Sequence, residues 1–194
     1  MRGKPFSVRR DRIFNRMRIS ISMAVAVVLI AMTVPRGARA QGDDLFSWGV
    51  TAGAAIPTNY LAKDHKTGVN AGITMAFGGV GQMLGIRVDG MFNQFGAKSG
   101  STAGSARILG GTVSLVLPLI GDRDRVYVIG GAGAYGMRPG VTGQSSNDFG
   151  LNGGIGLWLP GLNGFIEARY HHFYRVLANK RPAVFIPITV GILF

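Results

Sequence analysis

Eight segments of this chain alternate apolar residues with small or polar ones, and this alternation constrains the fold more than any other feature. A period of two is typical of a β-strand, because successive side chains of a strand point to opposite faces. The segments lie at 48–56, 67–77, 83–95, 106–117, 125–137, 149–159, 164–175 and 184–194. No stretch of useful length after residue 40 repeats with the period of a helix. The sequence therefore predicts an all-β protein.

The lengths of the segments and of their connections indicate a membrane barrel. Each segment has about 9–13 residues, which suits a tilted strand crossing a hydrocarbon layer and exceeds the usual soluble strand. Long connections are expected at 57–66, 96–105, 138–148 and 176–183, and short ones between them at 78–82, 118–124 and 160–163. Outer-membrane barrels show the same alternation of long and short connections. Because an open sheet edge cannot be satisfied in lipid, we expect a closed, eight-stranded antiparallel up-and-down transmembrane β-barrel over residues 41–194.

Glycine is unusually frequent, with 31 residues in a chain of 194. The interior of an eight-stranded barrel is only wide enough for its own side chains, so inward positions favour small residues. We expect glycine to make room in the lumen at positions 49, 53, 72, 85, 154, 156 and 191.

The first forty residues read as a signal peptide. They hold nine basic residues and one acid, so they carry most of the net charge of +12, and the stretch 19–34 has no charge. Ala38 and Ala40 fit a cleavage site before Gln41, and translation could begin at Met1 or Met17. An uncleaved anchor is the alternative, although sixteen residues fall short of the ~20 that span a bilayer. Without this segment the remaining net charge is small, so it gives no indication of nucleic-acid binding.

The C-terminal strand carries a family resemblance. Apolar residues occupy every second place before a final aromatic ring, with Ile188, Val190, Ile192 and Phe194 on one face. This pattern resembles the C-terminal assembly signal of bacterial outer-membrane barrels, and the segment 165–172 resembles the penultimate strand of the small OmpA/OmpX-like barrels. The resemblance implies secretion to the periplasm, handling by periplasmic chaperones and the barrel-assembly machinery, and a final place in outer-membrane lipid. We expect a monomer.

Four charged residues are expected inside the barrel. Arg87 and Asp89 share one face of their strand, and Glu167 and Arg169 share one face of another. Near the middle of the lipid each basic side chain would cost about 2–4 kcal/mol, and a buried charge needs a partner. The pattern predicts an interior ion-pair network that fills the lumen, and the alternative is an ion path or gate.

Other candidate sites are weaker. Residues 131–136 match the letters GxGxxG, but a turn at Arg138-Pro139-Gly140 follows where the dinucleotide motif requires a helix. His171 and His172 point to opposite faces of a strand, so they cannot hold one metal ion. Lipid A deacylases resemble this kind of barrel, but they have a serine closely after the histidine, which is absent here. We therefore predict no catalytic residue, no metal site and no cofactor.

The sequence leaves two further features to be placed: the inward face of one segment, and the aromatic residues near one end of the barrel. Both faces of 125–137 are apolar or glycine, and we favour Tyr127, Ile129 and Tyr135 pointing outward. Six aromatic residues near the short-turn end are expected to form a belt at the membrane surface, namely Trp48, Phe77, Tyr127, Trp158, Phe165 and Phe194.

These features favour a non-enzymatic, integral outer-membrane protein, either structural or displaying its loops to a partner, with a plugged lumen. The alternative is a narrow porin-like conduit for small or apolar solutes, and a weaker one is a lipid-modifying enzyme. A soluble lipocalin-like binder is the interpretation if the chain does not enter a membrane.

Overall fold

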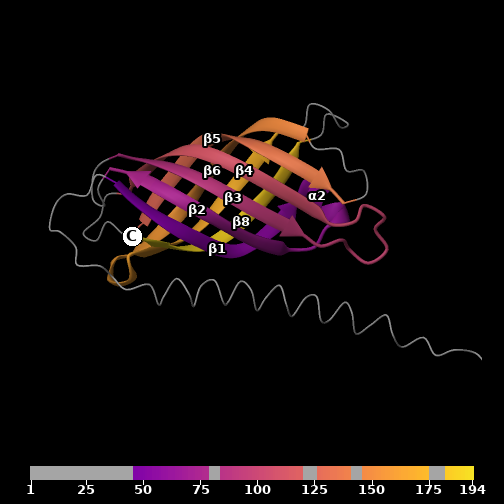
Figure 1. Ribbon diagram of the computed structural model, residues 1–194, viewed down its shortest axis with the longest axis horizontal. Helices are drawn as coiled ribbons and strands as arrows, with labels where there is room; N and C mark the ends of the chain where they lie inside the picture. Colours follow the sequence, from indigo (N-terminus) through magenta and orange to yellow (C-terminus); the bar gives the residue numbers. More distant parts are fainter. Residues whose placement is uncertain (1–45, 79–83, 120–125, 141–145, 175–181) are drawn as a thin grey trace, which may run out of the picture. The chain divides into compact units, whose positions relative to one another are not determined.

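The described residues form a closed antiparallel barrel of eight strands (Figure 1). The computed structural model describes residues 46–78, 84–119, 126–140, 146–174 and 182–194, which all belong to one unit of the chain, Arg36–Phe194. The strands are β1 (Phe46–Thr58), β2 (Gly68–Phe77), β3 (Gly85–Phe95), β4 (Ala106–Pro118), β5 (Val126–Pro139), β6 (Ser146–Leu159), β7 (Gly164–Phe173) and β8 (Ala183–Leu193). The predicted fold is confirmed. Residues 1–40, with the predicted cleavage residues Ala38, Ala40 and Gln41, lie outside the described residues.

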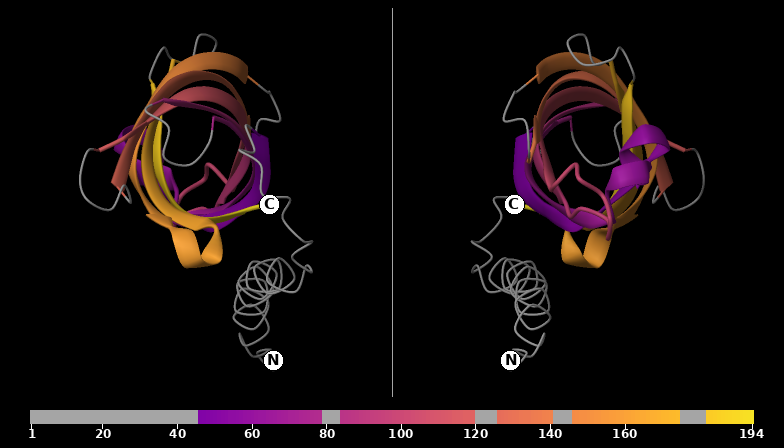
Figure 2. Two further views of the ribbon diagram at one scale, coloured as in Figure 1. Left: turned by 90° about the vertical axis from the view of Figure 1, so that its left-hand side faces the viewer. Right: turned by 90° about the vertical axis from the view of Figure 1, so that its right-hand side faces the viewer.

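Each strand pairs with its neighbours in sequence, and β1 closes the ring by pairing with β8. Figure 2 shows this ring from both ends of the barrel. The closing seam extends to the end of the chain, because Phe194 donates its backbone N–H to the carbonyl of Trp48 at 2.7 Å and accepts from Trp48 N–H at 3.2 Å. Among the eight described strands, none is left as an edge with a row of unpaired backbone groups, which is the condition for a sheet in lipid.

The sequence pattern indicated no helix after residue 40, but the connection after β1 contains a short one. Residues Asn59–Asp64 form a short helix, α2, and Leu61 is its buried residue. A 3₁₀ turn, η1 (Pro160–Leu162), connects β6 to β7. The connection between β5 and β6 is shorter than expected, because the two strands pair as far as Met137 and Ser146. Among the residues that the structure describes, no helix has the length and apolar character needed to span a bilayer.

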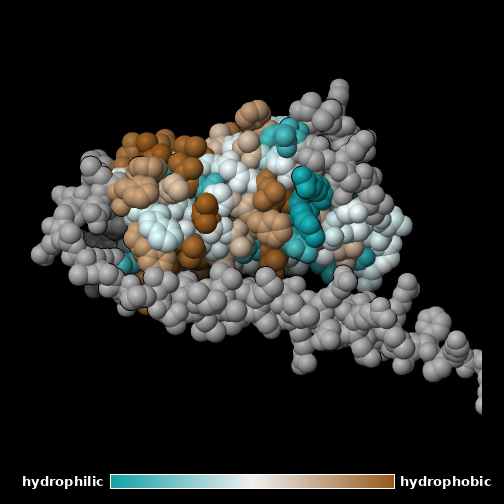
Figure 3. All heavy atoms as spheres, in the orientation of Figure 1, coloured by the Kyte–Doolittle hydropathy of each residue, from teal (hydrophilic) through white to brown (hydrophobic). Residues whose placement is uncertain are grey.

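The outer surface of the barrel is apolar along most of its length. The exposed large apolar residues lie on the outward rows of nearly every strand, and they include Ile73, Met75, Ile86, Val88, Leu109, Val113, Leu115, Leu117, Phe149, Leu151, Ile155, Leu157, Ile166, Ile188 and Val190. Figure 3 shows apolar residues over the left and middle of the visible face, with hydrophilic residues gathered toward the end that carries α2. A protein in water would not expose so large an apolar belt, so this surface suits contact with lipid.

The interior is filled in three layers. At the α2 end the lumen holds a cluster of apolar and aromatic residues, among them Phe95, Ile108, Tyr135, Met137, Phe173 and Phe185. At the short-turn end Tyr127, Ile129 and Phe165 form a second cluster. The buried charged residues Arg87, Asp89, Glu167 and Arg169 lie between the two clusters, with polar residues such as Thr112 beside them. The inward row of β7 shows all three layers in sequence, namely Phe165, Glu167, Arg169, His171 and Phe173.

The structure corrects the facing of β5. Tyr127, Ile129 and Tyr135 are 7%, 4% and 1% exposed, so they point into the lumen and not outward. The register explains this, because Gly131 pairs with Ser114 on β4 and Asn152 on β6, and both partners are buried inward residues. Paired residues on neighbouring strands share a face, so the odd-numbered residues of β5 must face inward.

The aromatic belt is also smaller than expected. Trp48, Phe77 and Phe194 lie on the outside, and Trp48 packs against Phe194 with ring centroids 5.1 Å apart. Phe46, which the sequence pattern did not single out, joins Phe77 at 5.2 Å. Tyr127 and Phe165 are buried in the lumen, and Trp158 packs against them. These three residues were therefore wrongly assigned to the belt.

Inward glycines make room as predicted, with one exception. A Cβ atom at Gly49, Gly53, Gly72, Gly154, Gly156 or Gly191 would overlap the neighbouring strand or a ring. At Gly156 the overlap is with the Tyr127 ring, so this glycine is what allows the tyrosine to fold inward. At Gly85 a Cβ would meet no atom closer than 3.6 Å, so crowding does not explain that glycine.

Candidate functional site: a charged layer inside the barrel

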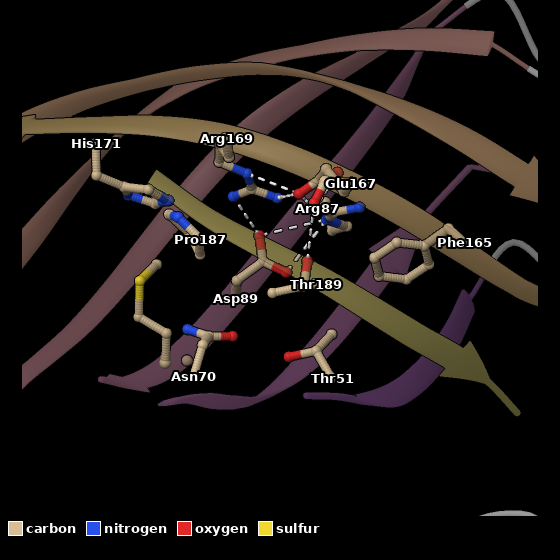
Figure 4. A pocket seen from close by; sticks show the side chains of 12 residues that line it. Thr51, Asn70, Arg87, Asp89, Phe165, Glu167, Arg169, His171, Pro187 and Thr189 are labelled. Carbon is tan, nitrogen blue, oxygen red and sulfur yellow. Dashed lines mark hydrogen bonds and ion pairs between the residues drawn. The ribbon is translucent and has the colours of Figure 1, made fainter. Parts of the chain in front are cut away.

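The structure brings the four predicted charged residues together in the lumen (Figure 4). Arg87 and Asp89 come from β3, and Glu167 and Arg169 come from β7. All four are at most 8% exposed. Residues two apart on a strand point to the same side, so each strand delivers one base and one acid to the same layer.

The four side chains form a closed cycle of opposite charges. Arg87 Nη2 donates to both carboxylate oxygens of Glu167 at 2.7 Å. Arg169 donates to Glu167 Oε1 through Nε at 2.9 Å and Nη2 at 2.6 Å, and to Asp89 Oδ2 through Nη1 at 2.9 Å. Arg87 Nε lies 3.2 Å from Asp89 Oδ1 and completes the cycle.

The cycle carries no net charge, because two guanidinium groups face two carboxylates. Burying four charges costs a large desolvation energy, and only near-complete pairing with good geometry offsets it. Neighbouring groups supply further contacts. Tyr127 donates its hydroxyl to Glu167 Oε2 at 2.9 Å, and the Arg87 guanidinium lies 4.8 Å from the centre of the Phe165 ring. Thr112 Oγ1 lies 3.5 Å from Asp89 Oδ2.

Tyr127 and Thr112 are part of this layer although the sequence pattern did not assign them to it. Nothing in the strand of Thr112 alone indicates that this residue lies beside Asp89. That information lies in the register of β3 with β4, where Asp89 pairs with Thr112. Tyr127 was missed because its strand has no polar row to reveal which face is inward.

The space beside the charged layer is small. A cavity of about 30 Å³ is lined by residues that include Thr51, Asn70, His171, Pro187 and Thr189. This volume holds one or two water molecules and is far below the several hundred cubic ångströms of a site for an organic ligand. The residues that line it belong to the middle layer or border it, so the layer leaves little free space in this part of the lumen.

His171 and His172 point to opposite sides of β7, as strand geometry requires. His171 lies in the lumen, where its Nδ1 is 2.9 Å from the Tyr135 hydroxyl and its ring stacks on Phe185 with centroids 4.9 Å apart. His172 lies outside, between the rings of Tyr170 and Tyr174. In the part of the chain that the structure describes, no group of three or more metal-binding side chains comes together.

The predicted C-terminal signal lies on the outer face of β8. Ile188 and Val190 are 45% and 48% exposed, and the Phe194 ring stands against Trp48 on the adjacent strand. The four residues of the predicted signal, Ile188, Val190, Ile192 and Phe194, present an apolar row to the surroundings of the barrel. Their role in assembly stays a prediction, because recognition by another protein leaves no trace in the folded chain.

Comparisons with known proteins agree with this architecture. No protein-family model matches the chain, and no curated protein matches it. Among solved structures, Neisserial surface protein A superposes with a TM-score of 0.51 at 14% identity, over 79% of this chain and 100% of that one. Ail, the attachment invasion locus protein of Yersinia pestis, gives a TM-score of 0.47 at 18% identity, over 77% of this chain and 96% of that one.

The fold is that of the small eight-stranded outer-membrane β-barrels. The OmpA/OmpX-like architecture expected from the C-terminal strand is therefore confirmed. The superposition supports the arrangement of the strands. At 14% identity it transfers no activity or ligand to this chain.

Proposed function

We propose that this chain is an integral outer-membrane barrel with a plugged lumen, which acts as a structural element or displays its loops to a partner. The observation that carries the proposal is the filling of the interior. A neutral cycle of four buried charges lies between two apolar clusters, while the outer surface carries an apolar belt. An aqueous channel would instead need a polar wall with open space along it.

The proposal includes the surroundings of the protein. We propose outer-membrane lipid as the surroundings of the apolar belt. The resemblance of β8 to an assembly signal supports a route through the periplasm with chaperones and the barrel-assembly machinery. We infer a monomer, since closure of β1 on β8 leaves no edge strand for a second copy. We assign no role to nucleic acid or to a cofactor.

We also propose that the protein is not an enzyme. His171 lies in the lumen beside a tyrosine hydroxyl and stacks on a phenylalanine, and His172 faces outward between two rings. The third histidine, His65, is buried with its Nδ1 at 3.1 Å from the carbonyl oxygen of Leu61. Acyl transfer needs a nucleophile beside a base, in a place that a substrate can enter. Among the described residues, the hydrogen bonds and ring contacts of these three histidines include no serine or threonine hydroxyl.

Planar-bilayer recording tests the plugged lumen. The purified full-length protein should insert without producing conductance steps, whereas a general porin prepared in the same way should produce them. The variant Glu167→Ala should also stay silent, because the apolar clusters on either side of the charged layer remain in place. Regular conductance steps from the native protein would contradict the plug and favour the narrow conduit.

A further inference from the structure

Two arginines stand directly opposite each other on the outer surface, at the end of the barrel that carries α2. Arg107 on β4 pairs in register with Arg138 on β5, and both side chains are exposed. They belong to the outward rows of their strands, and the next outward residue along β4 is Leu109. The arginine pair therefore marks the edge of the apolar belt.

The charge of this pair is not balanced by neighbouring residues. Across the sheet Arg107 pairs with Gln94, and Gln94 pairs with Val69, so the described part of this row contains no acid. The ion pairs and hydrogen bonds of the described residues include neither Arg107 nor Arg138. Like charges directly opposite on neighbouring strands destabilise a sheet. An anion from outside the chain would remove this repulsion.

The location of the pair indicates which anion. Leu109 is 56% exposed, and the outward row continues with the apolar residues Val113, Leu115 and Leu117. Two residues along a strand span about 7 Å, so the guanidinium groups lie one step beyond the hydrocarbon, at the depth of lipid headgroups. Guanidinium is planar and binds phosphate oxygens in pairs, which suits a lipid phosphate held between two arginines.

A row of small residues runs from the pair across the belt. Below Arg138 the outward row of β5 contains only small residues in its central part, namely Gly136, Ala134, Ala132 and Gly130. Larger residues flank most of this row, with Leu109, Val113 and Leu115 on β4 and Phe149 and Leu151 on β6, while Gly111 and Gly153 border it at the remaining places. A Cβ atom added to Gly130 would meet nothing closer than 3.8 Å, so packing within the barrel does not require glycine there.

An outward glycine with free space beside it permits close approach of something external. The row of small residues would accept an extended acyl chain, because its floor is backbone and the larger side chains along it are apolar. In α2 and the described connections at the same end, the exposed basic residues Lys63, Lys66 and Lys98 outnumber the one exposed acid described there, Asp64. This balance attracts anionic headgroups toward that end of the barrel.

We propose that Arg107 and Arg138 bind the phosphate of a membrane lipid whose acyl chain lies along the outer face of β5. This inference rests on the proposed location in a membrane, and it adds a defined lipid site to that location. The arginines recognise the phosphate, and the small-residue row of β5 recognises the chain.

Native mass spectrometry of the detergent-purified full-length protein tests the site. Phosphatidic acid should remain bound, and diacylglycerol with the same acyl chains should not. Each of Arg107→Ala and Arg138→Ala should weaken phosphatidic acid binding about fivefold, and the double variant about 25-fold. The matched control Lys66→Ala removes one positive charge at the same end and should change binding by less than about twofold.

Two further arms separate the lipid from other occupants. Inorganic phosphate at millimolar concentration should not displace the lipid, and Ala134→Leu should weaken lipid binding by filling the small-residue row of β5. Displacement by phosphate, or equal binding after Ala134→Leu, would overturn a site for the whole lipid. Equal binding by the double arginine variant would overturn the site itself, and loss of a dimer in Ala134→Leu would assign the row to a second copy.

The membrane location is checked in the same preparations. Each variant should still require detergent for solubility and should still show heat-modifiable migration on a gel. If lipid binding is lost while both properties remain, the result concerns the arginine site alone. A native protein that is soluble without detergent would instead remove the proposed function.

Discussion

At the scale of single residues, Glu167 joins both arginines of the charged layer to Tyr127. Its carboxylate accepts hydrogen bonds from Arg87, Arg169 and Tyr127. Removing one partner of a buried ion pair leaves the remaining charge buried without compensation. The free energy of unfolding then falls by more than it would if apolar residues replaced the whole pair. The two arginines would then share a single acid, Asp89.

The variant Glu167→Gln should lower the free energy of unfolding by about 3–5 kcal/mol. The amide keeps the size of the side chain, so the loss would report on charge and not on a cavity. Denaturant unfolding of the barrel in detergent, followed by tryptophan fluorescence, measures the change. Asp64→Asn makes the same chemical change at an exposed acid and should have an effect of less than about 0.5 kcal/mol. Equal effects would refute the special role of Glu167.

A second prediction concerns glycines on the two faces of the sheet. Gly156→Ala places a methyl group against the Tyr127 ring and should destabilise the barrel by about 1–3 kcal/mol. Gly130→Ala adds the same methyl group where no atom lies within 3.8 Å, and it should be neutral or stabilise by up to about 1 kcal/mol. Unfolding midpoints of the two variants measured side by side check this difference. Similar losses would mean that glycine matters through its backbone alone.

At the scale of the strand, alternation decides which substitutions are tolerated. Leu115 lies in the middle of the outward row of β4, between Val113 and Leu117. A charge placed there would stand in hydrocarbon, whereas a charge at the η1 turn would stand near the membrane surface. The same substitution should therefore have different costs at the two positions.

We expect Leu115→Arg to destabilise the barrel by about 2–4 kcal/mol, and Leu162→Arg by no more than about 1 kcal/mol. Both side chains are exposed, at 49% and 56%, so burial within the protein does not separate them. Unfolding in lipid vesicles gives the comparison. Equal costs in vesicles would argue that no hydrocarbon surrounds β4.

The last strand carries a prediction about assembly. Phe194→Ala should reduce the fraction of folded, heat-modifiable protein in cells, because this ring belongs to the segment that we predict to be an assembly signal. Phe46→Ala removes another outward aromatic residue at the same end and serves as the control, since its ring packs on Phe77 instead. The amounts of folded and unfolded protein in membrane fractions give the readout. Equal reductions in both variants would point to membrane-surface contacts and not to a signal.

At the scale of the whole molecule, the inside and outside of the barrel are reversed relative to a soluble protein. Charged and polar side chains fill the middle of the lumen, and large apolar side chains cover the outside. This arrangement is stable only where the surroundings are apolar, because the exposed belt has nothing else to pack against. The arrangement distinguishes a membrane barrel from a soluble barrel that carries a ligand.

The protein should therefore stay in the membrane fraction after washing with alkaline carbonate and dissolve only in detergent. It should also migrate faster on a gel without heating than after boiling, because the closed hydrogen-bonded barrel resists detergent until it is heated. Release by carbonate, together with identical migration before and after heating, would favour a soluble lipocalin-like binder.

Most of the fold could be predicted from the sequence, because the alternation of residues within a strand indicates which side chains point into the barrel. Where one face is apolar and the other polar, as around Arg87 and Glu167, the alternation places each side chain inside or outside without further information. The same pattern placed both arginines and both acids in the lumen. In β5 both faces are apolar or glycine, so the local pattern has no preference and the facing of Tyr127 and Tyr135 was assigned wrongly.

The sequence by itself determined the number of strands, their order, the closed barrel and the charged residues that face inward, because these depend on periodicity and on the hydrogen bonds that a sheet in lipid must satisfy. Only the tertiary structure decided which strands place their side chains at the same depth. Register joins Asp89 to Thr112, turns Tyr127 toward Glu167 and sets Arg107 opposite Arg138. A shift of register between neighbouring strands changes which side chains are paired, although the pattern within each strand stays the same. These pairs therefore cannot be predicted from any single segment.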